Sequence, residues 1–259
     1  NGTVADGAPA VGNTEIMTAG TSAFTTALSH TYKGYLGDST PIVTGATGDV
    51  TRTLQKRLDD YVSVKDFGAV GDDSTADGVA IQRALDELYR DTDTTVSNDT
   101  RARRTLFFPA GTYKIAASLT IPPYAHLVGE GPDKTIIKNS ASVPALVTED
   151  DEGNLYGGIG NAGATTPTQI QISDMTIRTT VAYGALSIDN ATKVFVNNCK
   201  FQGTFVSGGT DDSNSKGVTV RSSTALPSSY IIFDQCQFKG FARLVDISYD
   251  ALNVRFTNC

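Results

Sequence analysis

Acidic residues are the residues of this chain with the clearest capacity for catalysis. Two carboxyl groups held about 5 to 5.5 Å apart, or about 6.5 to 9.5 Å apart, can act together on a glycosidic bond. The candidates are Asp174, Asp211, Asp212 and Asp234, together with the acidic run from Glu149 to Glu152. Because Gly-Asn follows this run, it is interpreted as a solvated loop.

Asp174 and Asp234 belong to a repeat that begins after residue 168. Its equivalent positions are Met175, Cys199, Cys236 and Cys259, at intervals of 24, 37 and 23 residues. Coils of about 20 to 29 residues are typical of solenoids. The long interval contains a polar, glycine-rich insertion between Gly203 and Gly217. The repeat predicts stacked strands, with Asp174 and Asp234 two coils apart, or about 9.6 Å along the axis.

Alternation within each repeat predicts the interior, because successive strand residues face opposite sides. Four inward columns are expected: Ile170, Val194, Ile231 and Val254; Ile172, Val196, Phe233 and Phe256; Met175 and the three cysteines; and Ile177, Phe201 and Phe238. The cysteines are therefore expected to be small buried hydrophobes rather than disulfide partners. The polar turn pairs that include Asp174 and Asp234 are interpreted as a hydrogen-bonded ladder along the axis.

The segment that opens this region reads VSVKDFGAVGDDSTADGVAIQRAL, from Val62 to Leu85. Apolar residues between Val62 and Phe67 predict a short strand, and the glycines and Asp72-Asp73 that follow predict a turn. Asp77 is a favourable helix N-cap. One apolar helical face is then formed by Ala80, Ile81, Ala84, Leu85 and Leu88. We expect this helix to cap the first coil.

This segment resembles the opening motif of the pectate-lyase-like, right-handed parallel β-helix family, V-x-D-F-G-A-x-G-D-G-x-x-D-D-T-x-A-I-Q-x-A-[IL]. It departs from the motif at Asp73, Ala76 and Gly78, where glycine, aspartate and threonine are usual. The preceding TRTLQKRLDDY resembles the neck of bacteriophage tail spikes and tail fibres. The resemblance implies a mostly β chain. Its single-stranded β-helix would have an N-terminal capping helix and follow a neck helix and a small anchor segment.

The same resemblance implies three parts: a virion anchor over residues 1–49, a neck helix over 50–61, and the start of the β-helix over 62–259. We expect the β-helix to continue beyond Cys259. Two interpretations of residues 1–49 stay open, because their Gly, Thr, Ala and Ser content fits a flexible segment or one ordered by a partner. The neck helix could pack against two symmetry copies or against its own β-helix.

A tail-spike resemblance implies a homotrimeric structural virion protein assembled in the host cytoplasm. It would bind phage tail or baseplate proteins through residues 1–61. Its distal part would bind or depolymerise host surface polysaccharide, with any catalytic residues there or between subunits. One alternative is that this chain itself is a glycoside hydrolase or lyase acting on capsule or lipopolysaccharide. A carboxylate pair in a surface groove would favour it. The other is a secreted bacterial pectate-lyase-like enzyme, which a cleaved signal peptide would favour.

Composition excludes several other functions. A net charge of −7 argues against nucleic-acid binding, which needs clustered cations. No apolar run approaches the roughly 20 residues that span a bilayer, so no membrane insertion is expected. A zinc site needs about four nitrogen or sulfur ligands, but the only histidines are His30 and His126 and no Cys-x-x-Cys pair occurs. The sequence predicts neither a metal nor a cofactor.

Overall fold

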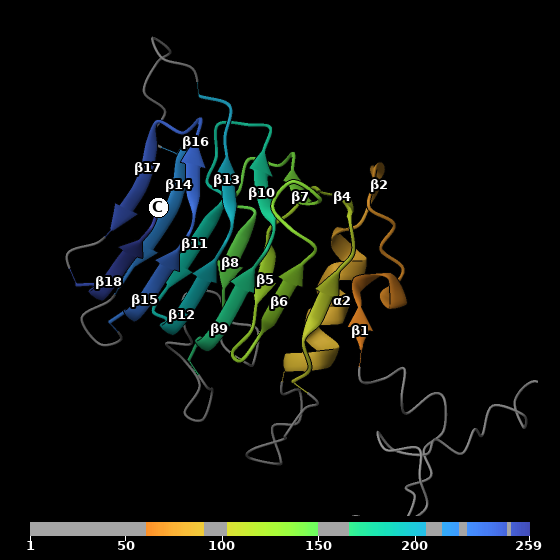
Figure 1. Cartoon of the computed structure of the whole chain (residues 1–259), viewed down its shortest axis with the longest axis horizontal. Helices are drawn as coiled ribbons and strands as arrows, with labels where there is room; N and C mark the ends of the chain where they lie inside the picture. Colours follow the sequence, from red (N-terminus) through yellow and green to blue (C-terminus); the bar gives the residue numbers. More distant parts are fainter. Residues whose placement is uncertain (1–60, 91–102, 150–165, 206–213, 223–226, 248–249) are drawn as a thin grey trace, which may run out of the picture. The chain divides into compact units, whose positions relative to one another are not determined.

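A computed structural model describes residues 61–90, 103–149, 166–205, 214–222, 227–247 and 250–259 of the chain (Figure 1). The predicted anchor, the neck helix up to residue 60 and the tip of the insertion at 206–213 lie outside the described residues. Within these ranges the chain is a mostly β solenoid, a right-handed parallel β-helix, as the sequence predicts. Each turn of the solenoid contributes strands to three parallel sheets.

The three sheets are named A, B and C in the order in which the chain visits them. Sheet A has seven strands: β1 (Val62–Ser63), β3 (Leu106–Phe108), β6 (His126–Gly129), β9 (Thr168–Ser173), β12 (Thr192–Asn197), β15 (Ser229–Asp234) and β18 (Leu252–Thr257). Sheet B has six: β2 (Asp72–Ala76), β4 (Gly111–Ile115), β7 (Thr135–Asn139), β10 (Thr176–Thr179), β13 (Lys200–Gln202) and β16 (Gln237–Lys239). Sheet C has five: β5 (Leu119–Ile121), β8 (Leu146–Thr148), β11 (Leu186–Asp189), β14 (Lys216–Arg221) and β17 (Arg243–Ile247).

The first coil has a helix where the later coils have a strand of sheet C. After β1 and β2, the chain enters α2 (Gly78–Tyr89), which packs beside β5. The Gln82 side-chain amide donates to the Thr120 carbonyl at 3.2 Å and accepts from the Thr120 N–H at 2.9 Å. It thus satisfies edge groups that a neighbouring strand would otherwise pair. The predicted capping helix is confirmed, with Ile81, Ala84, Leu85 and Leu88 buried.

The strand register confirms three of the predicted inward columns. Val194 of β12 pairs with Ile170 of β9 and Ile231 of β15, which in turn pairs with Val254. The columns that begin at Ile172 and Ile177 stack in the same way, although Phe256, the last member of the Ile172 column, is 37% exposed. Their aromatic members stack along the axis, with 5.0 Å between the ring centroids of Phe201 and Phe238. Like-on-like stacking therefore fills the interior.

The predicted burial of the column formed by Met175 and the three cysteines is confirmed for Met175 and two of the cysteines. Cys199 and Cys236 are free and buried, and burial raises the pKa of both thiols, to about 12 for Cys236. Cys259 is also free but exposed, so the prediction that it is buried is wrong for this residue. Its sulfur accepts a hydrogen bond from the Cys236 N–H at 3.4 Å, which keeps it in register with the column.

The opening segment differs from the prediction at its strand. Only Val62 and Ser63 form a strand, and η1 (Val64–Phe67) is a short 3-10 helix. Ser63 and Asp66 form a capping box, in which the Ser63 Oγ accepts from the Lys65 N–H and Asp66 accepts from the Ser63 N–H. These local hydrogen bonds compete with strand pairing. Gly68, with a φ of 100°, then ends the helix.

Asp77 occupies the predicted N-cap position but has a different role. Its side chain makes no capping hydrogen bond. The buried carboxylate instead accepts from the backbone N–H groups of Val70, at 2.7 Å, and Gly71, at 3.1 Å. It therefore holds the glycine turn against the helix. The predicted turn at Asp72-Asp73 includes the left-handed Asp73, but Asp72 also begins β2, which pairs with β4 across an irregular register.

Candidate functional site

The outer face of sheet C carries buried polar side chains. Along β11, Leu186 and Ile188 point inward, so Ser187 and Asp189 point outward. These two outward side chains are nevertheless buried, and that of Asp189 is only 1% exposed. Ser187 donates to Asp189 Oδ2 at 2.9 Å, and Arg221 Nε of the adjacent β14 lies 3.5 Å from Oδ1. No hydrogen bond within the described residues reaches Oδ1.

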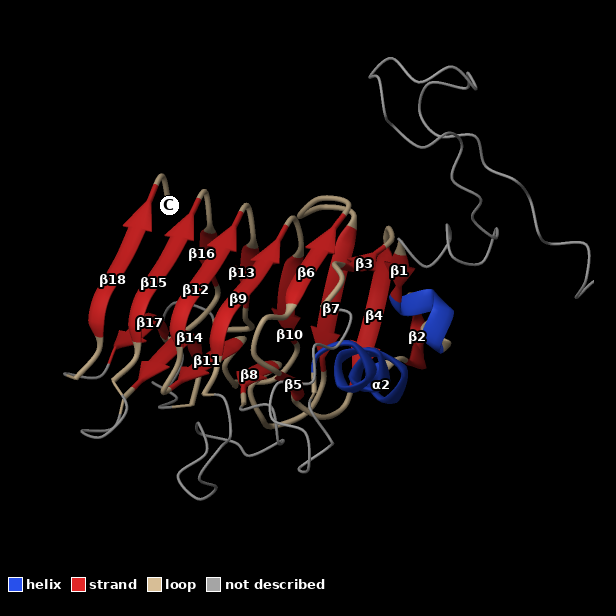
Figure 2. Ribbon diagram, turned by 90° about the horizontal axis from the view of Figure 1, so that it is seen from below, coloured by secondary structure: helices blue, strands red, loops and turns tan. Residues whose placement is uncertain are grey.

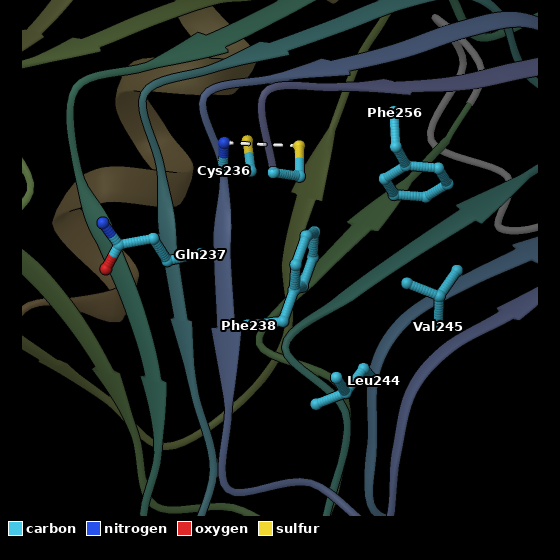
Figure 3. A pocket seen from close by; sticks show the side chains of 7 residues that line it. Cys236, Gln237, Phe238, Leu244, Val245 and Phe256 are labelled. Atoms are coloured by element: carbon cyan, nitrogen blue, oxygen red, sulfur yellow. Dashed lines mark hydrogen bonds between the residues drawn. The ribbon is translucent and has the colours of Figure 1, made fainter.

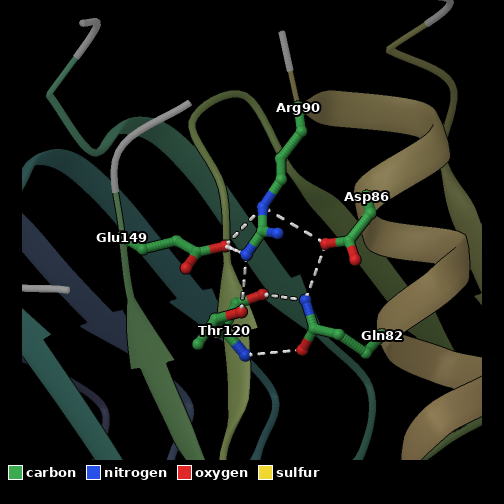
Figure 4. A network of polar contacts seen from close by, with 5 residues as sticks. All are labelled: Gln82, Asp86, Arg90, Thr120 and Glu149. Atoms are coloured by element: carbon green, nitrogen blue, oxygen red, sulfur yellow. Dashed lines mark hydrogen bonds and ion pairs between the residues drawn. The ribbon is translucent and has the colours of Figure 1, made fainter. Parts of the chain in front are cut away.

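A second buried carboxylate lies one strand away from Asp189. Glu149 directly follows β8, and its side chain is 1% exposed. Arg90, at the end of α2, donates to Glu149 Oε1 through both Nε and Nη2, and Nη2 also donates to Thr120 Oγ1 at 3.2 Å (Figure 4). Asp86 lies 3.2 Å from Arg90 Nε. The helix that covers the edge of sheet C thus also supplies the counter-ion for Glu149.

Burial dominates the electrostatics of this carboxylate pair. Removal from water raises the pKa of Glu149, although the Arg90 guanidinium opposes the shift. Burial also raises the pKa of Asp189, against the Ser187 hydroxyl and the Arg221 charge. Both acids thus keep their protons to a higher pH than exposed carboxyl groups.

The strands that carry Glu149 and Asp189 are neighbours, and neighbouring strands lie about 4.8 Å apart. Carboxyl groups with raised pKa values on adjacent strands have the chemistry that general acid–base catalysis uses. Neither side chain is open to solvent in this arrangement, so a glycosidic oxygen cannot contact them directly. The geometry fits a buried, charge-compensated network that carries potential acid–base groups. We name the two carboxylates, Glu149 and Asp189, together with their arginine partners Arg90 and Arg221, the carboxylate row.

The structure places Asp174 and Asp234 in a turn ladder, as the preferred interpretation predicts. Asn198 Nδ2 donates to Asp174 Oδ1 at 2.7 Å. Asp234 accepts from the side-chain amides of Asn197, at 3.3 Å, and Asn258, at 3.1 Å. The two aspartates lie on strands separated by β12 and contact different amides, so the structure does not bring them together as a pair.

Of the other acids predicted from the sequence, Glu149 belongs to the described residues and the rest do not. Asp211, Asp212 and the acidic residues 150–152 lie outside the described residues. Glu149 corrects the interpretation of the acidic run as a solvated loop, because it is buried beside Arg90. Asp189 is not among the acids predicted from the sequence, although the alternation of Leu186-Ser-Ile-Asp189 is a strand pattern that places this aspartate outward.

An apolar hollow of about 460 Å³ lies at the last described coil (Figure 3). Members of the inward columns, among them Cys236 and Cys259, line it together with Gln237 and with Leu244 and Val245 of β17. It offers no charged group to a polar ligand. Within the described ranges, no cluster of three or more His, Cys, Asp or Glu side chains could hold a metal ion. No described helix is long and apolar enough to cross a membrane.

Comparison with known families adds to this geometry. Residues 61–258 match the sequence profile of the family described as rhamnogalacturonase A/epimerase, pectate lyase-like. Among curated proteins, mannuronan C5-epimerase AlgE2 of Azotobacter vinelandii is 38% identical over 86 residues, which cover 30% of this chain and 8% of that protein. Alginate lyase 7 of the same organism is 34% identical over 122 residues, or 44% of this chain and 12% of that protein. The chain thus spans a small part of each relative.

Solved structures show the same fold. Tailspike protein 3 of bacteriophage CBA120 aligns with a TM-score of 0.51 at 17% identity, over 88% of this chain and 35% of that one. The gene product 12 N-terminal fragment of bacteriophage Phi29 also gives 0.51, at 18% identity, over 70% of this chain and 29% of that one. The A-module of the Azotobacter vinelandii mannuronan C-5 epimerase AlgE4 aligns with a TM-score of 0.51 at 18% identity, over 76% of this chain and 50% of that one.

Proposed function

We propose that this chain, which belongs to the rhamnogalacturonase A/epimerase, pectate-lyase-like family, forms part of a phage tail protein that binds host surface polysaccharide. The observation that carries the proposal is the unbroken solenoid. Its outer faces present side chains in straight rows, at about 4.8 Å from strand to strand. A linear surface of this kind suits a linear polymer.

The phage assignment is supported by two features of the chain. TRTLQKRLDDY, at residues 51–61, resembles the neck of tail spikes, and it runs directly into the family's opening motif. The fold of the described part is that of a phage tailspike protein, among others. Residues 1–61 would attach the protein to the tail, three copies would assemble at the neck, and the β-helix would face the host.

Binding of the purified chain to polysaccharide tests the proposal. Affinity electrophoresis through gels that contain polymannuronate, bacterial capsular polysaccharide or lipopolysaccharide-derived polysaccharide measures retardation. We expect retardation by at least one acidic polysaccharide. Migration unaffected by every polysaccharide in the panel would overturn the proposed function. Light scattering on the same sample tests the trimer, because a monomer would overturn the assembly at the neck.

A second candidate function, a polysaccharide-degrading enzyme, is favoured by the raised pKa values of Glu149 and Asp189. In this case a rearrangement that exposes the two acids would have to come before catalysis. The protonated acid would then donate to a leaving glycosidic oxygen, and the partner carboxylate would act as base or nucleophile. New reducing ends released from a bound polysaccharide measure the activity. Glu149→Gln and Asp189→Asn should each abolish it, whereas Lys138→Gln should leave it unchanged. Equal activity of all variants would exclude these two acids.

A further inference from the structure

The outer face of sheet A differs from the rest of the solenoid in what it exposes. The strand register aligns one outward row across β6, β9, β12, β15 and β18: His126, Gln171, Phe195, Ile232 and Arg255. Figure 2 shows these strands side by side along the solenoid. Phe195 is 40% exposed in the middle of the row. An aromatic ring therefore lies open between an amide on one side and an aliphatic side chain on the other.

A second row lies beside the first, at a backbone irregularity that recurs on each strand. Gln169, Lys193, Tyr230 and Asn253 have φ values of 54°, 56°, 57° and 54°, and the strand pairing passes over each of them. All four side chains are exposed, and that of Tyr230 is 58% exposed. A second aromatic ring and a cation thus stand next to Phe195 on the same face.

The backbone conformation of Tyr230 is energetically unfavourable, and the packing of its side chain does not compensate for this cost. The left-handed conformation is unfavourable for large side chains and is best tolerated by Gly, Asn and Asp. The equivalent position on β18 is Asn253, so the fold accepts the residue that suits this conformation. No ring contact of Tyr230 with another described aromatic residue compensates for the cost. Backbone outliers of this kind cluster at ligand-binding sites, which makes the exposed Tyr230 ring a candidate for contact with a ligand.

The cations on this face differ from those of the other sheets in their partners. Lys193 and Arg255 have no carboxylate partner among the described residues. On sheets B and C, in contrast, Lys138 pairs with Asp73, Lys200 with Asp133 and Lys216 with Asp246. The nearest row along the strands carries one carboxylate, that of Asp234, which accepts hydrogen bonds from two asparagine amides. Two exposed cations thus stand on this face of a chain whose net charge is −7.

We propose that the outer face of sheet A binds an anionic polysaccharide, laid across β9 to β18 along the solenoid axis. We name Gln171, Lys193, Phe195, Tyr230 and Arg255 the sheet A platform. The rings of Phe195 and Tyr230 pack against the apolar faces of sugar rings. Lys193 and Arg255 pair with carboxylate groups of the sugars, and Gln171 hydrogen-bonds to hydroxyl groups.

The composition of the platform favours this occupant over a protein. Exposed Lys, Gln and Arg side chains flank its two rings, so the platform is richer in charged and amide groups than the apolar centre that protein interfaces bury. The alternation of flat rings, amides and cations matches a uronate polymer, which offers apolar ring faces, hydroxyl groups and regularly spaced negative charges. The inference rests on the proposed function and deepens it, because it names the face and the charge of the polysaccharide.

Asparagine substitutions test the platform without disturbing the fold. Lys193→Asn and Tyr230→Asn each introduce the residue that β18 already has at this position, so thermal stability should be kept or raised. Polymannuronate is the probe, dextran is its uncharged counterpart, and polyglutamate supplies charge without sugar. We expect each variant to weaken the Kd for polymannuronate about tenfold. Wild-type protein should not bind dextran, and should bind polyglutamate more weakly than polymannuronate.

The matched control is the double variant Lys239→Asn, Arg243→Gln, which removes two exposed cations from sheets B and C. It should bind polymannuronate as the wild type does. If Lys193→Asn and Tyr230→Asn bind as tightly as the wild type, or if the control weakens binding equally, the platform is overturned and the proposed function stands. If the wild type binds no polysaccharide at all, both the platform and the proposed function are overturned. Binding of polyglutamate as tight as that of polymannuronate would overturn the sugar contact.

Discussion

The outer faces of sheet C and sheet A differ in the burial and pairing of their charged side chains. On sheet C, Glu149 and Asp189 are buried and each has an arginine partner. On sheet A, Lys193 and Arg255 are exposed and have no carboxylate partner among the described residues. Both faces belong to the same solenoid. The difference lies in the outward residues and their burial, and in the left-handed residues that recur on the strands of sheet A.

This contrast separates stability from recognition. A buried ion cannot lose a partner without a large cost, because its desolvation is then uncompensated. An exposed side chain contributes little to stability, so it is free to contact a ligand. We therefore expect substitutions on sheet C to change the free energy of unfolding. Substitutions on the sheet A platform should change binding instead.

The largest effect is expected when Glu149 loses its counter-ion. Arg90→Met keeps an apolar stem but leaves the carboxylate buried and unpaired, so the free energy of unfolding should fall by about 3 to 5 kcal/mol. Lys138→Met, which breaks the partly exposed pair with Asp73, should cost less than about 1 kcal/mol. Urea unfolding followed by circular dichroism measures both. Equal losses in the two variants would contradict the distinction between the faces.

A smaller effect is expected at the edge of sheet C. Gln82→Met fills the same space but removes both hydrogen bonds to the Thr120 backbone, which should cost about 1 to 3 kcal/mol. Hydrogen exchange at the Thr120 amide should become faster. The control is Gln202→Met, which removes only a side-chain hydrogen bond with Arg178 on sheet B. Unchanged exchange at Thr120 would show that α2 does not protect this edge.

The pH dependence of stability should distinguish sheet C as well. The folded-state pKa of Asp189 is raised, so the folded state binds this proton more tightly than the unfolded state. The resulting stability is fully present below the unfolded pKa, about 3.9, and is lost as pH rises through the raised value. In Asp189→Asn, unfolding measured from pH 4 upward should show a shallower decline than the wild type. Parallel curves would contradict the raised pKa.

The smallest effect is expected on the sheet A platform. Phe195→Thr removes an exposed ring but keeps a residue that favours strands, so the free energy of unfolding should change by less than about 0.5 kcal/mol. The adjacent inward substitution Val196→Thr should cost more, because it buries a hydroxyl group in the apolar column. Thermal melts of the two variants provide the comparison. A Phe195→Thr loss as large as that of Val196→Thr would show that the ring is structural.

The sequence predicted the solenoid because its signal is local and repeated. Column residues such as Val194 and Val196 alternate within one strand, and the same pattern returns on the next coil. The turn ladder at Asp174 and Asn198 could be read in the same way. The strand predicted from Val62 to Phe67 stops at Ser63 for a local reason, because a capping box closes a helical turn from Val64 onward.

The carboxylate row could not be predicted in this way. Arg90 and Glu149 are 59 residues apart, and the strands β3 to β8 lie between them in the sequence. No periodicity links a residue at the end of a helix to one that follows a strand. The sequence by itself determined the coil, its interior columns and the burial of Cys199 and Cys236, because these depend on alternation and repeat length. Only the tertiary structure decided that Glu149 is buried beside Arg90, since coil closure sets which distant charges meet.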